Sequence, residues 1–204
     1  MEKQIQNIKD WLGEGSVNIF GRPFTGKDTQ GKKLAELLGG VLLGGGDILR
    51  GSEIPEHVKE LMHAGKLVPT EDYLEIVLPY LKKNDFRGKP LILSSVGRWH
   101  GEEAGFLEAM AASNHSLRAV VHLKMEEAEV WQRWEVAPPR ESHGLRADDT
   151  LESLQIRLQE YREKTLPVVD FYRNQGLLIE VDGTTPRDEV TAAIIAGLDE
   201  FSRR

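Results

Sequence analysis

The sequence predicts an α/β protein whose parallel β-sheet of about five strands is covered by helices on both faces. Short, mostly apolar runs alternate with helical patterns along the chain, and such runs are typical of strands buried on both faces. A glycine-framed turn between the first strand and the next helix is a second indication of a parallel α/β unit. Strands are expected at 17–20, 41–43, 90–93, 117–123 and 177–181.

Helical patterns fill the intervals between these strands. Apolar Ile5, Ile8, Trp11 and Leu12 recur at helical spacing and predict a short helix before the first strand. The segment 137–144 reads A-P-P-R-E-S-H-G, and its helix-breaking residues predict a loop. No internal repeat or long linker appears, so a single domain is expected. Further helices are expected at 27–38, 55–64, 71–81, 102–112, 128–135, 151–174 and 186–201.

The composition excludes several classes of function. The chain has 204 residues, a formal net charge of −7 and no cysteine. The acidic balance argues against a nucleic-acid binder, and the missing cysteines exclude disulfides, thiol catalysis and Cys-ligated zinc. Residues 1–10 lack the apolar centre of a signal peptide, and no apolar run has membrane-spanning length. We therefore expect a cytoplasmic protein, a monomer, with no membrane or nucleic-acid partner.

Residues 21–29 read G-R-P-F-T-G-K-D-T and stand between the first strand and the next helix. The G-x-x-x-x-G-K spacing in this context predicts a phosphate-binding loop. Gly21 and Gly26 let backbone N–H groups face an anion, and the helix N-terminus and Lys27 add positive charge. The alternative interpretation is a surface turn with a chance Gly-Lys pair. Asp28 stands where the usual loop has Ser or Thr.

Two other expected strands are each followed by an arginine. Arg50 follows the second strand and three glycines at 44–46, and Arg98 follows the third strand after S-S-V-G. Ligands of open α/β sheets bind at the carboxyl ends of strands, where a guanidinium offers paired hydrogen bonds to phosphate. A flexible loop followed by a solvated arginine is the alternative for Arg50.

Four more arginines, Arg133, Arg140, Arg146 and Arg157, lie in the expected loop at 137–144 or near it. Arginines that converge on a phosphate loop would neutralise a phosphoryl group during transfer, which depends on charge stabilisation rather than covalent chemistry. Arg157 could instead pair with glutamates on its own helix. The six histidines show no metal-ligand spacing.

Six motifs, in the same order along the chain, resemble those of the adenylate kinase family of nucleoside monophosphate kinases. Residues 21–30 resemble the loop G-x-P-G-x-G-K-G-T-Q, 46–50 match G-D-x-L-R, and 65–69 match G-x-L-V-P. Arg98 falls on the arginine of D-G-F-P-R. Residues 146–149 with Arg157 match R-x-D-D and the arginine eleven residues later, and 181–183 match V-D-G.

The resemblance implies a P-loop nucleoside monophosphate kinase fold and phosphoryl transfer from ATP to a nucleoside monophosphate, AMP first, with Mg²⁺. It implies a helical monophosphate-binding insert at about 44–83 and a short lid at about 134–146. The implied ATP site comprises Gly21, Pro23, Thr25, Gly26, Lys27, Asp28, Thr29 and Arg133. The implied monophosphate site comprises Gly45, Arg50, Val68, Arg98 and Glu102. The implied catalytic residues are Lys27, Arg98, Arg140, Arg146 and Arg157.

The chain departs from the family pattern in the phosphate loop and beside the metal. Phe24 replaces a loop glycine, and Ser94 and Ser95 replace the Asp-Gly of D-G-F-P-R, whose aspartate helps to hold hydrated Mg²⁺. Asp28 replaces the glycine after the loop lysine. We expect Asp28 to take over the magnesium shell through water. The competing interpretation is that Asp28 repels the phosphates or caps the helix.

The base pocket also differs, because Glu102 stands where the family has an adenine-reading Gln and Gly45 where AMP-specific members have Thr. An ionised carboxylate only accepts hydrogen bonds, so Glu102 favours a base edge rich in donors. Alternatively, Glu102 points to solvent and Glu103 or the backbone reads the base. Two other functions stay open: a P-loop kinase of another small metabolite, and a nucleotide-binding regulator with weakened catalysis.

Overall fold

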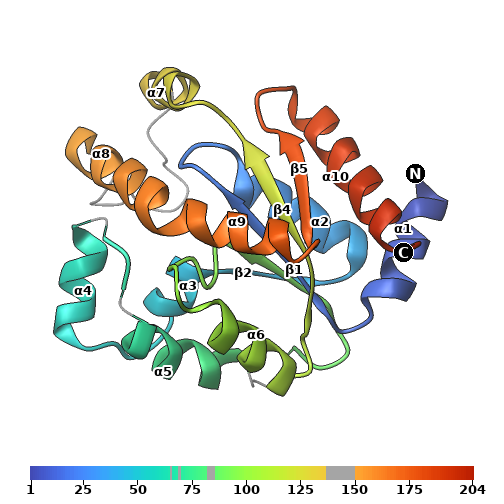
Figure 1. Cartoon of the computed structure of the whole chain (residues 1–204), viewed down its shortest axis with the longest axis horizontal. Coiled ribbons are helices and arrows are strands. Elements are labelled where there is room, and N and C mark those ends of the chain that lie inside the picture. The colour runs from blue at the N-terminus through green and yellow to red at the C-terminus, as the bar shows by residue number, and fades with distance from the viewer. Residues whose placement is uncertain (65, 69, 82–85, 137–149) are drawn as a thin grey trace.

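The computed structural model describes residues 1–64, 66–68, 70–81, 86–136 and 150–204 (Figure 1). Its strands form one parallel sheet in the order β2-β3-β1-β4-β5. The predicted fold class is confirmed, and each expected strand is found within one residue at either end. The strands are β1 (Ser16–Gly21), β2 (Val41–Gly44), β3 (Leu91–Ser94), β4 (Leu117–Lys124) and β5 (Leu178–Asp182).

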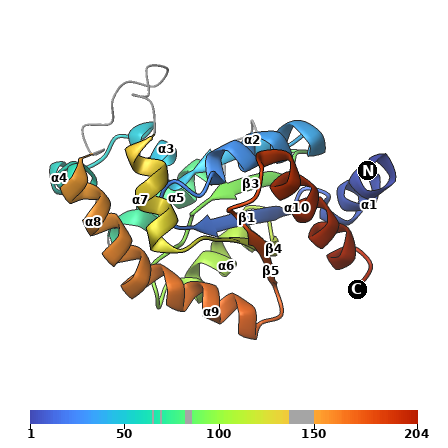
Figure 2. The same cartoon turned by 90° about the horizontal axis from the view of Figure 1, so that it is seen from above.

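Helices cover both faces of the sheet, with α2 on one side and α6 and α9 on the other (Figure 2). One short helix, α3, was not predicted, because the glycines at 45 and 46 suggested a loop; it begins directly after β2. The helices are α1 (Glu2–Leu12), α2 (Lys27–Leu38), α3 (Gly45–Arg50), α4 (Glu56–His63), α5 (Thr70–Leu81), α6 (Glu103–Ala112), α7 (Glu127–Glu135), α8 (Leu151–Glu160), α9 (Leu166–Asn174) and α10 (Arg187–Phe201).

The two faces of the sheet are built from alternating strand residues. Val17 and Ile19 of β1 belong to a core shared with α1, α2 and α10. Phe20, the next residue, packs on the opposite face against Val168 and Tyr172 of α9. Because side chains alternate along a strand, one apolar strand supplies both cores, and every residue of β1 is buried.

The strand order brings three loops to the same edge. β1 lies between β3 and β4, with Ile19 in register with Ser94 and Gly21 with Leu123, and Gly44 at the end of β2 pairs with Ser94. The chain therefore leaves β1, β2 and β3 at neighbouring points of the carboxyl edge, where open α/β sheets bind ligands. The helices α3, α4 and α5, between β2 and β3 in sequence, lie at that end of the molecule (Figure 1).

A buried asparagine fixes the loop that follows β3. The Asn18 side chain on β1 donates from Nδ2 to the carbonyl of Val96 at 2.7 Å and accepts from its N–H at 3.4 Å. Both polar groups of the buried amide are thereby satisfied inside the sheet. The backbone path toward Arg98 is consequently tied to the central strand.

The expected helix at 151–174 contains a π-helical turn at Tyr161–Thr165, between α8 and α9. The Leu166 N–H bonds the Tyr161 carbonyl, five residues earlier. Pro167, at the start of α9, lacks an N–H donor, and its ring crowds the preceding turn. These two effects account for the wider, π-helical turn of the backbone at this point. The π-helical turn directs the side chains of Tyr161 and Thr165 toward the carboxyl edge of the sheet.

Tyr161 is anchored to the sheet through a buried histidine. The Tyr161 hydroxyl lies 2.7 Å from Nε2 of His122, a residue of β4 that is only 6% exposed. Burial lowers the pKa of the His122 imidazole to about 4, although the Glu180 carboxylate, 3.8 Å from Nδ1, opposes the shift. Burial also raises the pKa of the Tyr161 phenol. Both side chains are therefore neutral near neutral pH.

This histidine makes stability depend on pH. Below its ordinary pKa of 6.5 the unfolded chain takes up a proton at His122, whereas the folded protein does so only near pH 4. The free energy of unfolding of the wild type should therefore fall by about 2 kcal/mol more than that of His122→Gln between about pH 7 and about pH 5. Urea unfolding at both pH values measures this difference. His63→Gln, at an exposed position, is the control, and parallel profiles for wild type and His122→Gln would contradict the prediction.

Candidate active site

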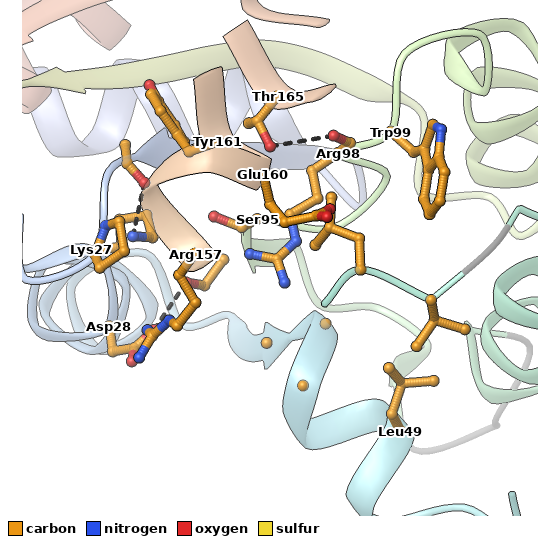
Figure 3. Close-up of a pocket in the computed structure, with 18 of the residues that line it drawn as sticks. Lys27, Asp28, Leu49, Ser95, Arg98, Trp99, Arg157, Glu160, Tyr161 and Thr165 are labelled. Carbon is orange, nitrogen blue, oxygen red and sulfur yellow. Dashed lines mark hydrogen bonds between the residues drawn. The ribbon is translucent and has the colours of Figure 1, made fainter. Parts of the chain in front are cut away.

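A cleft of about 230 Å³ opens at the carboxyl edge of the sheet (Figure 3). Its walls come from the loop after β1, the starts of α2 and α3, the segment between α4 and α5, the loop after β3, and the π-helical turn with its flanks. These segments are far apart in sequence and meet only because β2, β3 and β1 are neighbours. The cleft is therefore a product of the strand order.

The loop at 21–26 forms one end of the cleft. Gly26 has φ 90°, a left-handed conformation that favours glycine, and α2 begins at the next residue. A Cβ at Gly21 would lie 2.9 Å from the backbone oxygen of Leu123, so no larger residue fits there. The Lys27 ammonium donates to the carbonyls of Gly21 at 2.8 Å and Arg22 at 2.7 Å. Lys27 is partly buried and braces its own loop, rather than facing solvent freely.

Phe24 occupies the loop position where the family pattern has glycine, and its φ of 63° is uncommon for a side chain of this size. Its ring packs against a cluster that includes Met125, Val130 and Leu154. The Phe24 carbonyl accepts a hydrogen bond of 3.3 Å from Arg133 at the end of α7. Packing and this hydrogen bond hold the loop against α7 and offset the backbone strain.

Arg133 links two loops instead of lining the cleft. Besides the bond to Phe24, its guanidinium donates to the carbonyl of Gly183 at 2.8 Å and of Thr184 at 3.4 Å, just beyond β5. It thus joins the loop after β1 to the loop after β5. A planar guanidinium with several fixed donors suits this bridging position.

Asp28 and Ser94 meet beside the loop that follows β1. The Ser94 hydroxyl at the end of β3 donates to Oδ1 of Asp28 on α2 at 2.8 Å. Ser94 is 6% exposed, whereas Asp28 is exposed and lines the cleft (Figure 3). The sequence predicted a metal-binding role for Asp28 and marked Ser94 as the loss of the family aspartate, but the contact between them depends on β3 lying beside β1.

Cationic and hydroxyl groups also line the cleft. Arg98 and Arg157 both line the cleft (Figure 3). The Thr165 hydroxyl, in the π-helical turn, donates to the Arg98 carbonyl at 3.2 Å and fixes the backbone there. Nearby, the Lys164 ammonium lies 2.7 Å from a Glu160 oxygen and 3.9 Å from the centre of the Trp99 ring. A cation–π contact and an ion pair therefore order this rim.

Glu102 and Glu103 have different surroundings. Glu102 is 4% exposed and lines the cleft. The Glu103 carboxylate lies 2.9 Å from Nδ1 of His100 and accepts from the Gly101 N–H at 2.8 Å. Glu103 thus stabilises its own turn, and the alternative interpretation, in which Glu102 points to solvent, is wrong.

Most of the expected site residues line this one cleft: Gly21, Pro23, Gly26, Lys27, Asp28, Thr29, Gly45, Val68, Arg98, Glu102 and Arg157. Two do not: Arg133 bridges loops as above, and Thr25 is 3% exposed with its hydroxyl bonded to the Arg22 carbonyl at 2.9 Å. Arg140 and Arg146 lie outside the described residues, as does the side chain of Arg50.

Part of the lining was not predicted from the sequence, notably Leu49, Met62, Glu160, Tyr161 and Thr165. Glu160, Tyr161 and Thr165 follow Arg157 by three, four and eight residues, which is helical spacing on one face. This periodicity was a usable signal for those three. Leu49 and Met62 looked like ordinary core residues.

Within the described ranges, no group of three or more His, Cys, Asp or Glu residues could hold a metal ion. A metal at this cleft would therefore need oxygen atoms from a bound ligand in addition to those of the protein. The same ranges contain no helix that is long and apolar enough to cross a membrane.

Comparison with known proteins matches the sequence of this chain to the adenylate kinase family. The family model of adenylate kinase matches residues 19–177. The chain is 36% identical over 192 residues to an adenylate kinase of Phenylobacterium zucineum, covering 88% of this chain and 95% of that protein. It is 36% identical over 192 residues to one of Agrobacterium fabrum, covering 90% and 97%, and 31% identical over 215 residues to one of Methanosarcina barkeri, covering 92% and 100%.

Proposed function

Because this chain belongs to the adenylate kinase family, we propose that it is a nucleoside monophosphate kinase that transfers the γ-phosphoryl group of ATP to AMP or a related monophosphate. The observation that carries this proposal is the single cleft in which the phosphate loop with Lys27 faces Arg98 and Arg157. Two polyanionic substrates that exchange a phosphoryl group need such a concentration of fixed positive charge. The protein would contribute to this reaction by positioning the substrates and stabilising their charge.

The ATP phosphates are assigned to the loop at 21–29. Gly26, in its left-handed conformation, opens the start of α2, whose N–H groups and dipole attract an anion. Lys27, held over the loop by its hydrogen bonds to two carbonyls, adds a point charge. Arg133, which does not line the cleft, stabilises this loop through its hydrogen bond to the Phe24 carbonyl.

The monophosphate is assigned to the other arm of the cleft. Arg98 provides a phosphate-binding guanidinium, with Gly45, Val68 and Glu102 around the remaining volume. Arg157 is assigned to the transferring group, since it lines the same cleft from α8. The roles that the family motifs imply for Arg50, Arg140 and Arg146 remain predictions. The division into a monophosphate-binding insert at about 44–83 and a lid at about 134–146 is also a prediction.

Magnesium fits the cleft by donor chemistry, because the Asp28 carboxylate and the hydroxyl groups of Thr29 and Ser94 line it beside the phosphate loop. When bound with ATP, the ion would neutralise charge on the phosphates. The partners would be ATP and the monophosphate alone. A monomeric state and a cytoplasmic location stay predictions from the sequence.

Incubating the purified protein with ATP, Mg²⁺ and each of several monophosphates, while following ADP and the new diphosphate, tests this function. The expected result is one ADP and one new diphosphate for each ATP consumed, which with AMP as acceptor means two ADP. A P-loop kinase of another metabolite would form neither with any monophosphate, and a binding regulator would bind ATP without turnover.

Replacing the loop lysine should separate catalysis from folding. Lys27→Ala removes a charge from the phosphate site, so the rate of ADP formation should fall at least about 10³-fold. Thermal unfolding should remain cooperative, because Lys27 lies outside the buried apolar cores. Lys32→Ala, an exposed position on the same helix, is the matched control. Retention of most activity in Lys27→Ala would refute the phosphate-loop assignment.

The two cleft arginines should act on different kinetic constants. Arg98→Ala should raise the monophosphate KM at least about tenfold, because it removes a contact present in the ground state. Arg157→Ala should lower kcat about 100-fold with a smaller change in KM, because its charge is needed most when the phosphoryl group is between donor and acceptor.

Steady-state kinetics with both substrates varied provides the measurement for these arginines. Arg87→Ala, an exposed arginine away from the cleft, should leave all constants unchanged. An unaltered monophosphate KM in Arg98→Ala would show that this division of roles is wrong.

Glu102 should influence which base is accepted. Its carboxylate, when ionised, only accepts hydrogen bonds; guanine offers N1–H and N2–H₂, whereas adenine and cytosine each offer one amino group. We expect measurable activity on a monophosphate other than AMP, with GMP and CMP tested first. In Glu102→Gln, the ratio of kcat/KM for AMP to that for GMP should rise about tenfold, the size of one net hydrogen bond.

The control for the base test is Glu108→Gln, an exposed glutamate on the same helix α6. The measurement is a panel of monophosphates at fixed ATP. Strict use of AMP by the wild type, unchanged in Glu102→Gln, would eliminate a role for Glu102 in reading the base.

A further inference from the structure

Asp28 places a negative charge at the entrance of an anion-binding loop. It is the second residue of α2, directly after Lys27, and its side chain lines the cleft. An acidic residue in the first turn suits the helix dipole, but it opposes the arrival of nucleotide phosphates at the same N-terminus. Phosphate binding at this loop is therefore opposed by the Asp28 charge unless a cation arrives with the phosphates.

The direction of Asp28 is set by a contact across the sheet edge. The Ser94 hydroxyl donates to Oδ1 at 2.8 Å, so the carboxylate is held toward the end of β3. Ser94 itself is buried and in register with Ile19 and Gly44, the neighbouring strand residues. The carboxylate is thereby ordered before any nucleotide binds, which lowers the entropy lost when it orients a ligand.

The other carboxylates that line the cleft, Glu102 and Glu160, belong to segments other than the phosphate loop. Glu160 lies 2.7 Å from the Lys164 ammonium beside Trp99, and Glu102 precedes α6, beyond Arg98. Among the described residues that line the cleft, Asp28 is the carboxylate that adjoins the phosphate loop. Mg²⁺ at nucleotide phosphates is commonly held by one or two carboxylates together with phosphate oxygens and water.

P-loop proteins use the residue after the loop lysine to reach the metal, through a Ser or Thr hydroxyl. Asp28 occupies that position with a charged oxygen instead. A divalent cation between Asp28 and the phosphates would turn the repulsion described above into attraction.

We propose that Asp28, oriented by Ser94, holds the magnesium shell of bound ATP in this protein, either directly or through a water molecule. This inference rests on the proposed function, since it requires ATP in the cleft. Because no described cluster could hold a metal alone, the site should gain Mg²⁺ affinity only when the nucleotide is present.

Binding experiments without a monophosphate test the proposal independently of turnover. Calorimetry gives the Kd of ATP with Mg²⁺ and with EDTA, and electron paramagnetic resonance of free Mn²⁺ gives the Kd of Mn²⁺ for the protein–ATP complex. Asp28→Asn removes the charge but keeps the size and an acceptor for Ser94. In this variant the Kd values of Mg²⁺–ATP and of Mn²⁺ should each rise about tenfold or more, a loss of about one charge-assisted interaction.

The competing explanation gives the opposite sign. If Asp28 only repels phosphates, Asp28→Asn should tighten ATP in EDTA and leave the Kd values of Mg²⁺–ATP and Mn²⁺ unchanged or lower. If Asp28 only stabilises the helix, the variant should melt at a lower temperature with all three Kd values unchanged. Either outcome would overturn the proposal.

Two further variants complete the test. Ser94→Ala should raise the Kd of Mn²⁺ about threefold, because the carboxylate loses its orienting donor, and no change would refute the role of Ser94. Glu36→Gln removes an exposed charge from the same helix and should change none of the constants. Failure of the wild type to form diphosphates would count against the proposed function, whereas unchanged metal binding in Asp28→Asn would count against this inference alone.

Discussion

The hydrogen-bonded position of β1 between β3 and β4 is the constraint on which the rest of the molecule depends. All six residues of β1 are buried, and its backbone is paired on both sides. Because β1 is the middle strand of a parallel sheet, the loop with Lys27 that follows it emerges at the centre of the carboxyl edge. The loops after β2 and β3 follow because those strands are the next in order.

Charge is distributed unevenly over this framework. The chain carries a net charge of −7, yet Lys27, Arg98 and Arg157 line a single cleft. Cations gathered in one cleft of an acidic protein attract anionic ligands there, while the net negative charge limits non-specific binding to other polyanions. The Glu160 carboxylate does not cancel this field, because the Lys164 ammonium pairs with it at 2.7 Å.

Irregular backbone is concentrated around the cleft. Phe24 and Ser95 have positive φ values of 63° and 53°, and the π-helical turn at Tyr161–Thr165 supplies part of the wall. Such conformations persist only where surrounding contacts stabilise them. Phe24 packs against Met125 and Val130, the Ser95 N–H donates to the Ile19 carbonyl at 3.0 Å, and Tyr161 is held by His122.

The sequence alone determined the fold class, five strands to within one residue at each end, and the glycine-framed turn between β1 and α2. These features depend on local patterns: apolar runs give buried strands, and glycines at a fixed spacing before a lysine give the turn. Helix α3 was missed because its glycines look like a loop. The turn at Tyr161–Thr165 was missed because the helical pattern runs through it without a break, so the sequence predicted one helix at 151–174.

Tertiary structure decided how the side chains of the cleft meet. Local patterns could not tell that Ser94 would bond Asp28, or that Glu102 rather than Glu103 would face the cleft. Nor could they predict that Arg133 would join the loops after β1 and β5. The contacts of Ser94 and Arg133 join segments that strand order brings together, and the direction of Glu102 depends on the turn before α6. The spacing of side chains within one segment carries no information about how far that segment lies from another.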